Sequence, residues 1–243
     1  MRTMLGNSRS LAIVPARGGS KGIPNKNRRL FLGRPLIEWT IMTALNSKQC
    51  DRVVVSTDDH VISSISLACG AEVPFIRPSE YAKDTTSTVA VVRHTVDWLE
   101  DNEQYVPDNI LVLEPTSPGR RSEHIRQAIE ILVSDRTDSV ASVVEVPHHF
   151  SPAKQLKLIE NSRIVGISGL CPEQMVHRRQ DLPITHAFDG TIFSCKYDVI
   201  KQTPPSIWGN VTKGFMVDSR YSVDLDELDD WIPAEEKLRQ VLI

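Results

Sequence analysis

Apolar positions along the first half of the chain fall into short runs that alternate with longer periodic stretches. The short runs are apolar or rich in β-branched residues, as is typical of buried strands, and they occupy 11–14, 52–56, 72–76, 110–113 and 139–146. The longer stretches repeat apolar residues at helical spacing and predict helices at 35–46, 61–69, 88–100 and 122–132. This alternation predicts an α/β fold, with a mostly parallel sheet and helices on both faces.

The pattern changes between 147 and 188, where prolines, histidines and arginines are frequent and helical spacing is lost. We expect this segment to leave the core and to act as a substrate lid, a dimer arm or both. A strand is expected again at 190–195, and another at 215–217. The whole pattern predicts a single domain at 10–243, preceded by a loose start at 1–9.

The final stretch, 226–242, is expected to be helical. Proline lacks an amide proton and disturbs a helix interior, so Pro233 is expected to divide this region into two short helices. The candidate core residues of the region are Leu228, Trp231, Ile232 and Leu238.

Composition narrows the functional classes. The 243 residues carry a formal net charge of −3, which argues against a broad nucleic-acid-binding face. The sequence has no apolar span long enough for a transmembrane helix, and 1–9 lack the apolar centre of a signal peptide. The four cysteines are widely spaced without a C-x-x-C pair, so we expect reduced thiols, no zinc site and a cytoplasmic protein with no membrane partner.

A basic, glycine-rich loop follows the first predicted strand. Its glycines and cations are Gly18, Gly19, Gly22, Arg17, Lys21 and Lys26. Ligands of such sheets bind beyond the carboxyl ends of the strands, and glycines let backbone amides approach an anion there. The spacing matches neither the G-x-G-x-x-G dinucleotide fingerprint nor a Walker loop. A polyphosphate is the implied ligand; the alternative is a plain strand–helix turn with solvated cations.

An acidic pair near the C-terminus is the candidate metal site. Side chains alternate along an extended segment, so Asp224 and Asp226 are expected on the same side. Two carboxylates on one face suit Mg²⁺ that also contacts phosphates. The alternative is that Asp226 caps the last helix, and both roles are compatible.

Two more polar segments, 56–58 and 115–118, follow predicted strands at the same edge of the sheet. Ordinary Asx and Ser/Thr turns would explain their composition equally well. Arg77, Arg178 and Arg179 lie beside predicted turns and could bind carboxylates, although a solvated arginine is the simpler interpretation of each.

Six motifs occur in an order that resembles one enzyme family. They are Pro-Ala-Arg-Gly-Gly-Ser-Lys-Gly-Ile-Pro-Asn-Lys-Asn, Val-Ser-Thr-Asp, Arg-Pro-Ser-Glu-Tyr-Ala-x-Asp, Pro-Thr-Ser-Pro-x-Arg, Arg-Arg-Gln-Asp-Leu-Pro and Ser-Val-Asp-Leu-Asp. Together, over about residues 11 to 242, they resemble the acylneuraminate cytidylyltransferases, that is, CMP-sialic acid synthetases and relatives acting on other nonulosonic acids. The resemblance implies a Rossmann-like nucleotidyltransferase sheet, CTP and a nonulosonic sugar acid as substrates, Mg²⁺ with Mn²⁺ as a possible substitute, and a homodimer joined through 147–188.

The resemblance also implies roles for individual residues. Catalysis would rest on Arg17, Lys21, Asp224 and Asp226, of which the two aspartates would hold the metal. The nucleotide would be bound by Ala16, Arg17, Gly18, Ser20, Lys21, Asn27, Arg77, Thr86 and Thr88. The sugar acid would be bound by Glu114, Thr116, Ser117, Lys154, Arg179, Gln180 and Asp189.

Two positions depart from the sialate pattern of this family. Glu114 stands where a glutamine is usual, and Asp189 where an asparagine is usual. An amide donates and accepts hydrogen bonds, whereas an ionised carboxylate only accepts. We therefore expect a sugar with additional N–H donors, such as a diamino or diacylamino nonulosonate, with N-acetylneuraminate as the other choice. The alternative is that an internal cation such as Arg120 or Arg179 pairs with these carboxylates.

Three other functions compete with this interpretation. A cytidylyltransferase for the eight-carbon acid Kdo would share the fold, but its loop usually has Thr-Arg-Leu-Pro where this chain has Lys-Gly-Ile-Pro. A non-catalytic nucleotide-binding regulator of the same fold would not need the acidic pair. An assembly protein that uses 147–188 as a scaffold would not need the phosphate loop.

Overall fold

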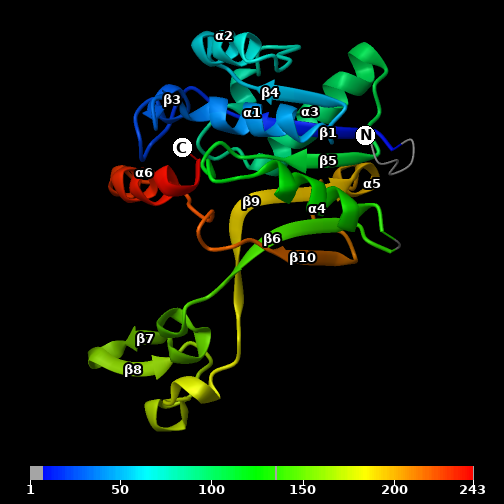
Figure 1. Cartoon of the computed structure of the whole chain (residues 1–243). Coiled ribbons are helices and arrows are strands. Elements are labelled where there is room, and N and C mark those ends of the chain that lie inside the picture. Colours follow the sequence, from blue (N-terminus) through cyan, green and yellow to red (C-terminus); the bar gives the residue numbers. More distant parts are fainter. Residues whose placement is uncertain (1–7, 135, 243) are drawn as a thin grey trace.

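A computed structural model describes residues 8–134 and 136–242. Its centre is a six-stranded sheet in the order β10-β6-β9-β5-β1-β4 (Figure 1). The strands are β1 (Ser10–Pro15), β4 (Arg52–Ser56), β5 (Asn109–Val112), β6 (Ser139–Glu145), β9 (His186–Lys196) and β10 (Thr212–Met216). All neighbours are parallel except that β9 runs antiparallel to β5 and β6, so the predicted mostly parallel α/β sheet is confirmed.

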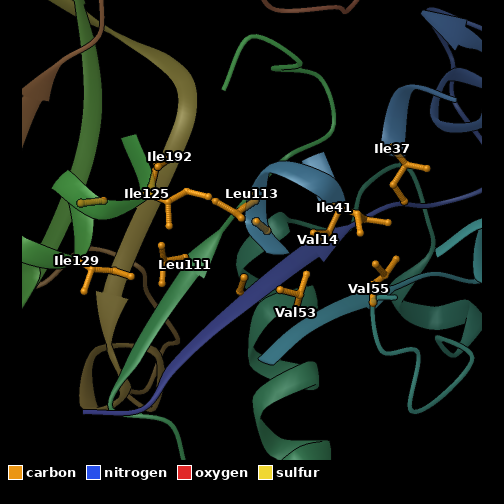
Figure 2. Close-up of a cluster of buried hydrophobic side chains, with 14 of the residues drawn as sticks. Val14, Ile37, Ile41, Val53, Val55, Leu111, Leu113, Ile125, Ile129 and Ile192 are labelled. Carbon is orange, nitrogen blue, oxygen red and sulfur yellow. The ribbon is translucent and has the colours of Figure 1, made fainter. Parts of the chain in front are cut away.

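Helices cover both faces of the sheet. They are α1 (Leu36–Ser47), α2 (His60–Ala68), α3 (Thr88–Glu103), α4 (Ser122–Leu132), α5 (Tyr197–Ile200) and α6 (Leu228–Leu242). The α1 and α4 side chains pack with one set of strand residues, as Figure 2 shows for Ile41, Ile125 and Val14. The α3 and α5 side chains pack with the other set, which includes Ile13. The side chains of β1 therefore contribute in turn to the hydrophobic cores on the two faces of the sheet, because successive side chains of a strand point to opposite faces.

Local signals account for where the helices begin. The Asp59 carboxylate accepts hydrogen bonds from the Val61 and Ile62 amides and so caps α2. The Ser87 hydroxyl accepts one from Ala90 and caps α3. The helices predicted at 35–46, 61–69, 88–100 and 122–132 are therefore confirmed to within a few residues at each end.

Two expectations about local structure are wrong. The strand predicted at 72–76 is an extended segment with only two isolated bridges, at Glu72 and Ile76, because Pro74 lacks the amide that a strand would use. The C-terminal region is one continuous helix with Pro233 inside it. The carbonyl that loses its usual partner there belongs to Asp229, which is exposed to water. Trp231 is buried as predicted, with Leu238, whereas Leu228 and Ile232 are exposed.

The α6 helix attaches the C-terminal region to the loop after β1. A small hairpin, β2 (Leu30–Phe31) and β3 (Arg34–Pro35), precedes α1. Phe31 meets Trp231 edge to face with ring centroids 5.5 Å apart, and both lie in a cluster with Ile23 and Leu225. This cluster fixes the segment that contains Asp224 and Asp226 beside the glycine-rich loop.

Residues 147–185, here called the arm, project away from the sheet (Figure 1). The arm contains a hairpin of β7 (Leu156–Ile159) and β8 (Arg163–Gly166), and single 3₁₀ turns such as His148–Phe150 and Arg179–Asp181. The strand expected at 190–195 is longer than predicted, because β9 continues its pairing with β6 back to His186, where the arm ends.

Residues 1–7 of the predicted loose start lie outside the described residues, while the Arg9 amide donates to the Asp108 carboxylate at 2.6 Å. Across the described part of the chain, no helix combines the length and apolar character that crossing a membrane requires.

Candidate active site

A cleft of about 320 Å³ opens at the carboxyl ends of β1 and β5. Four segments form its walls: the loop after β1, the segment that leads into α3, the turn after β5, and the segment before α6. Among the site residues expected from sequence, the cleft is lined by Arg17, Ser20, Asn27, Arg77, Thr86, Thr88, Glu114, Thr116 and Asp226. The fold therefore brings most of the predicted nucleotide residues together with one of the two predicted metal ligands.

The glycine-rich loop is held by bonds within the protein. The Asn27 side-chain amide donates to the Arg17 carbonyl at 2.9 Å, and the Gly18 amide donates to the Asp58 carboxylate at 2.9 Å. A Cβ at Gly22 would lie only 2.0 Å from the Asp226 carbonyl oxygen. Gly22 thus lets the loop touch the acidic segment, and the Gly18 amide is already engaged. That the loop glycines present their amides to an anion stays a prediction.

The loop cations all have carboxylate partners. Arg17 Nη1 lies 2.6 Å from Asp84 Oδ1, and Lys21 Nζ lies 3.1 Å from Asp84 Oδ2. Lys21 is itself exposed and reaches the cleft only through this contact. Lys26 lines the cleft, donating to the Leu225 carbonyl at 2.5 Å and lying 3.3 Å from Asp226 Oδ1. The resemblance gave Lys26 no role; its position as the loop's third cation is the signal that could have found it.

Arg77 is buried at the back of the cleft. Its guanidinium donates to the Ser56 hydroxyl at 3.1 Å and to the Ser56 carbonyl, and so fixes the turn after β4. Burial lowers the pKa of Arg77 to about 10, partly offset by the charge of Asp58. Tyr81, which sequence analysis did not single out, lies beside Arg77 and also lines the cleft.

The acidic pair lies where the loop meets α6. Desolvation by the surrounding protein atoms raises the pKa of Asp224, even though the residue is partly exposed. The charges of Asp226 and Glu114 raise this pKa further. A hydrogen bond with Thr116 and the charge of Lys26 act in the opposite direction. Asp226 does not cap the last helix, which begins at Leu228; the Asp230 carboxylate instead accepts from the Asp226 amide at 2.9 Å.

These residues fit a magnesium ion that is shared with a ligand. Among the described residues, no three His, Cys, Asp or Glu side chains are grouped closely enough to hold a metal by themselves. Mg²⁺ is commonly held by one or two carboxylates together with substrate phosphates. Desolvation, and after it the charge of Asp226, raise the pKa of Asp224, and a cation beside both carboxylates would offset both effects.

Glu114 faces the cleft, where its Oε1 accepts a hydrogen bond from the Thr88 hydroxyl at 3.0 Å. Behind it lies Arg120, which is almost wholly buried. Arg120 donates to the Glu114 carbonyl at 2.7 Å, the Thr191 carbonyl at 2.6 Å and the Thr40 hydroxyl at 2.9 Å. Burial lowers the pKa of Arg120 to about 10, and the nearby charges of Glu114 and Asp189 oppose this shift.

Asp189 is also buried, but its carboxylate bonds within its own strand. It accepts from the Thr191 amide at 3.2 Å and from the Thr191 hydroxyl at 2.6 Å. Direct pairing of Arg120 with Glu114 or Asp189 is absent among the described ion pairs, so Arg120 influences both carboxylates only through its charge. Of the two departures from the sialate pattern, only Glu114 lines the cleft.

Apart from Thr116, the other expected sugar residues do not line this cleft. Lys154 lines a separate cavity of about 300 Å³ in the arm, with Met175 and His177. Arg179 and Gln180 are exposed on the arm. Ser117 is buried with its hydroxyl unpartnered, and Ala16 is buried in the core at the end of β1.

Comparison with known proteins places this geometry in a family. A model of the cytidylyltransferase family matches residues 11–187. The chain is 32% identical to the CMP-N,N'-diacetyllegionaminic acid synthase of Legionella pneumophila, over 94% of this chain and 95% of that protein. It is 36% identical to the pseudaminic acid cytidylyltransferase of Campylobacter jejuni, over 64% of this chain and 66% of that protein. These matches define a nucleotidyltransferase, and the chain belongs to the cytidylyltransferase family.

Longer relatives and solved structures extend the comparison. The N-acylneuraminate cytidylyltransferase of Streptococcus agalactiae is 32% identical over 91% of this chain, which spans only 51% of that protein. A solved CMP:2-keto-3-deoxy-manno-octonic acid synthetase complexed with CTP aligns with a TM-score of 0.70 at 15% identity, over 97% of this chain and 100% of that one. A 4-diphosphocytidyl-2C-methyl-D-erythritol synthase from Anaerococcus prevotii aligns at 0.63 with 13% identity, over 96% and 99%. At such identities the likeness to these structures shows the fold alone.

Proposed function

We propose that this enzyme joins CTP to a nonulosonic sugar acid, giving the CMP-sugar and pyrophosphate. The observation that carries the proposal is the cleft, in which the basic loop, Asp226 and Glu114 face one another across a single cavity. The names of the relatives support the substrate class, because they refer to legionaminic, pseudaminic and acylneuraminic acids. The Kdo alternative is supported only by a likeness of fold at 15% identity.

The reaction depends chiefly on how the protein positions the two substrates and stabilises the negative charge of the phosphates. The anomeric hydroxyl oxygen of the sugar acid attacks the α-phosphorus of CTP, the bond from that phosphorus to the bridging oxygen breaks, and pyrophosphate leaves while the hydroxyl proton passes to water. Arg17, Lys21 and Lys26 supply positive charge beside the phosphates. Such preorganised charge is worth more in a cleft than in water.

Asp224 and Asp226 are the residues that would hold Mg²⁺ or Mn²⁺. When bound, the ion would neutralise phosphate charge and help to orient the triphosphate. Lys26 lies beside Asp226 and limits the repulsion within the acidic pair before the ion binds. Gly22 keeps this pair next to the loop, since any side chain there would collide with the Asp226 backbone.

The Glu114 carboxylate indicates which class of sugar acid the cleft would bind. Its carboxylate accepts one hydrogen bond, from Thr88, and faces the cleft. A donor on the substrate would satisfy it, and the additional acylamino or amino N–H groups of a diamino or diacylamino nonulosonate are such donors. Relatives named for legionaminic and pseudaminic acids support this choice, but others are named for N-acylneuraminate, so the preference over N-acetylneuraminate rests on Glu114.

We further propose that the protein is a homodimer in which the arm of one subunit serves the cleft of its partner. Lys154, Arg179 and Gln180 lie on an arm that projects away from its own sheet. Apolar side chains of the arm are exposed, among them Leu158 and Ile184, as they would be if a second subunit covered them. The free cysteines support a cytoplasmic setting, in which thiols stay reduced.

The experiment that tests the reaction is pyrophosphate release from CTP with a panel of acids: a diacetylated diamino nonulosonate, N-acetylneuraminate and Kdo. Release should depend on a nonulosonate and on CTP, and should not occur with ATP, GTP or UTP. Release with Kdo but not with the nonulosonates would establish the alternative enzyme. Binding of CTP without any release across the panel would favour the non-catalytic regulator.

A further inference from the structure

Asp84 holds two of the three cations that the proposed reaction assigns to phosphates, Arg17 and Lys21. Its two carboxylate oxygens divide between them, with Oδ1 2.6 Å from Arg17 Nη1 and Oδ2 3.1 Å from Lys21 Nζ. Asp84 lies in the segment before α3 and lines the same cleft. A phosphate group offers adjacent oxygens to two cations in the same way, so the carboxylate stands where a phosphate oxygen pair would bind.

This contact is specific within the described part of the chain. No other carboxylate there forms an ion pair with Arg17 or Lys21. The hydrogen bond from Lys21 and that from Arg17 keep the pKa of Asp84 below its usual value, so the group is ionised at neutral pH. The surrounding turn does not depend on the Asp84 side chain, because the Thr86 amide donates to the Lys83 carbonyl at 3.0 Å and the Thr86 hydroxyl to the Glu80 carbonyl at 3.2 Å.

We propose that Asp84 is an internal competitor for the phosphate-binding cations, and that a nucleotide or pyrophosphate binds by displacing its carboxylate from Arg17 and Lys21. This inference rests on the proposed function, since it takes the loop to be the phosphate site. It assigns Asp84 a role in setting the affinity for every ligand whose phosphates reach these cations.

The exposure of the contact makes the displacement feasible. The Arg17, Lys21 and Asp84 side chains are 31%, 75% and 43% exposed, and exposed ion pairs are weak and screened by salt. A polyphosphate carries more negative charge than one carboxylate and therefore wins the competition, at a cost in affinity. The same cost applies to the product pyrophosphate, so Asp84 would ease its release.

The test is calorimetric binding of pyrophosphate and of CTP to Asp84→Asn in buffer containing Mg²⁺, without sugar. The variant should bind both ligands roughly three- to tenfold more tightly than wild type, the range expected for removing two exposed ion pairs. Asp84→Glu, which keeps the charge, should stay close to wild type. The control is Glu80→Gln, which removes an equal charge from an exposed residue of the same segment that does not line the cleft; it should leave both affinities unchanged.

The outcomes separate this inference from the proposed function. If the wild type binds CTP and pyrophosphate but Asp84→Asn binds them no more tightly, the competition is refuted while the cytidylyltransferase proposal stands. Weaker binding by Asp84→Asn would instead make Asp84 a residue that orients the two cations, and would also refute the competition. A wild type that binds neither ligand would refute the phosphate site itself. Thermal melts of Asp84→Asn, Asp84→Glu and Glu80→Gln establish that each variant is folded.

Discussion

The cleft and the arm differ in how completely one chain organises them. Around the cleft, polar groups are held by partners in the same chain: Arg77 by Ser56, Arg120 by three separate elements, and Lys26 by the segment before α6. In the arm, the expected sugar-binding residues Arg179 and Gln180 are exposed and lie outside the cleft.

The two regions also differ in how far their apolar side chains are covered: those under the cleft are buried, and those of the arm are exposed. The strands beneath the cleft are buried on both faces, with Ile13 and Leu111 fully covered. The β7–β8 hairpin of the arm exposes much of Leu156 and Leu158. A single chain therefore builds the proposed nucleotide half of the site, whereas the sugar half as proposed needs a second subunit.

The largest effect is expected at the acidic pair of the nucleotide half. Asp224→Asn or Asp226→Asn should lower kcat by at least about a hundredfold, because one charge-stabilising group in an active site is commonly worth a few kcal/mol. Pyrophosphate release at limiting Mg²⁺ is the measurement. Asp229→Asn, which changes an exposed acid of the first turn of α6, should be near wild type. Near-normal turnover by both site variants would exclude the metal assignment.

The next effect concerns the arm. Arg179→Ala should raise the KM for the sugar acid by about tenfold or more, because charge-assisted hydrogen bonds contribute about 1.5–3 kcal/mol. The Kd for CTP should not change. Lys157→Ala, which removes an exposed lysine of β7, serves as the control.

Mixing two impaired variants tests the assignment of the arm to a partner. Asp226→Asn and Arg179→Ala chains, each impaired alone, should regain activity when co-expressed, because a mixed dimer contains one cleft with both a wild-type acidic pair and a wild-type partner arm. No gain from a demonstrated mixed dimer would mean that each arm serves its own cleft or none.

The same contrast explains what the sequence could predict. Strand and helix positions follow from local periodicity, which is why the β1 and α3 segments were found, and the basic loop is read directly from consecutive residues. The bonds of Arg120 join residues 71 and 80 positions apart in the chain, and nothing in the local pattern signals them. The engagement of the Gly18 amide by Asp58 is likewise set by packing between two strands.

Pro233 and Ile232 show the limits of propensity and periodicity. Proline predicts an interrupted helix. Packing of Trp231 and Leu238 in one cluster with Phe31 of the β2–β3 hairpin nevertheless keeps α6 continuous. Ile232 was expected in the core and is 67% exposed, because the buried face of α6 is set by where that hairpin lies. Tertiary contacts therefore outweighed the helix-breaking tendency of Pro233 and the burial expected of Ile232.

A smaller effect should distinguish Glu114 from Asp189. Glu114→Gln restores an amide in the cleft and should shift the kcat/KM preference toward N-acetylneuraminate by about fivefold or more, since an unmatched donor or acceptor costs about 1 kcal/mol or more. Asp189→Asn should leave the preference unchanged, because that carboxylate is engaged by Thr191. Wild-type enzyme that already favours N-acetylneuraminate over diamino nonulosonates would refute the substrate argument and leave the cytidylyltransferase assignment intact.

The smallest effect is a change in stability at the acidic pair. The folded-state pKa of Asp224 is raised, so its ionisation opposes folding; this cost is absent below the ordinary Asp pKa and grows as the pH rises through the raised value. At pH 7 without metal, Asp224→Asn should therefore raise Tm, by no more than about 2 °C given the solvent screening of a partly exposed group. Mg²⁺ with CTP should stabilise the wild type more than the variant, because only the wild type keeps both carboxylates for the ion. Differential scanning calorimetry at pH 4 and pH 7 is the measurement, and a variant that is less stable than wild type at pH 7 would show that the Thr116 hydrogen bond outweighs desolvation and repulsion together.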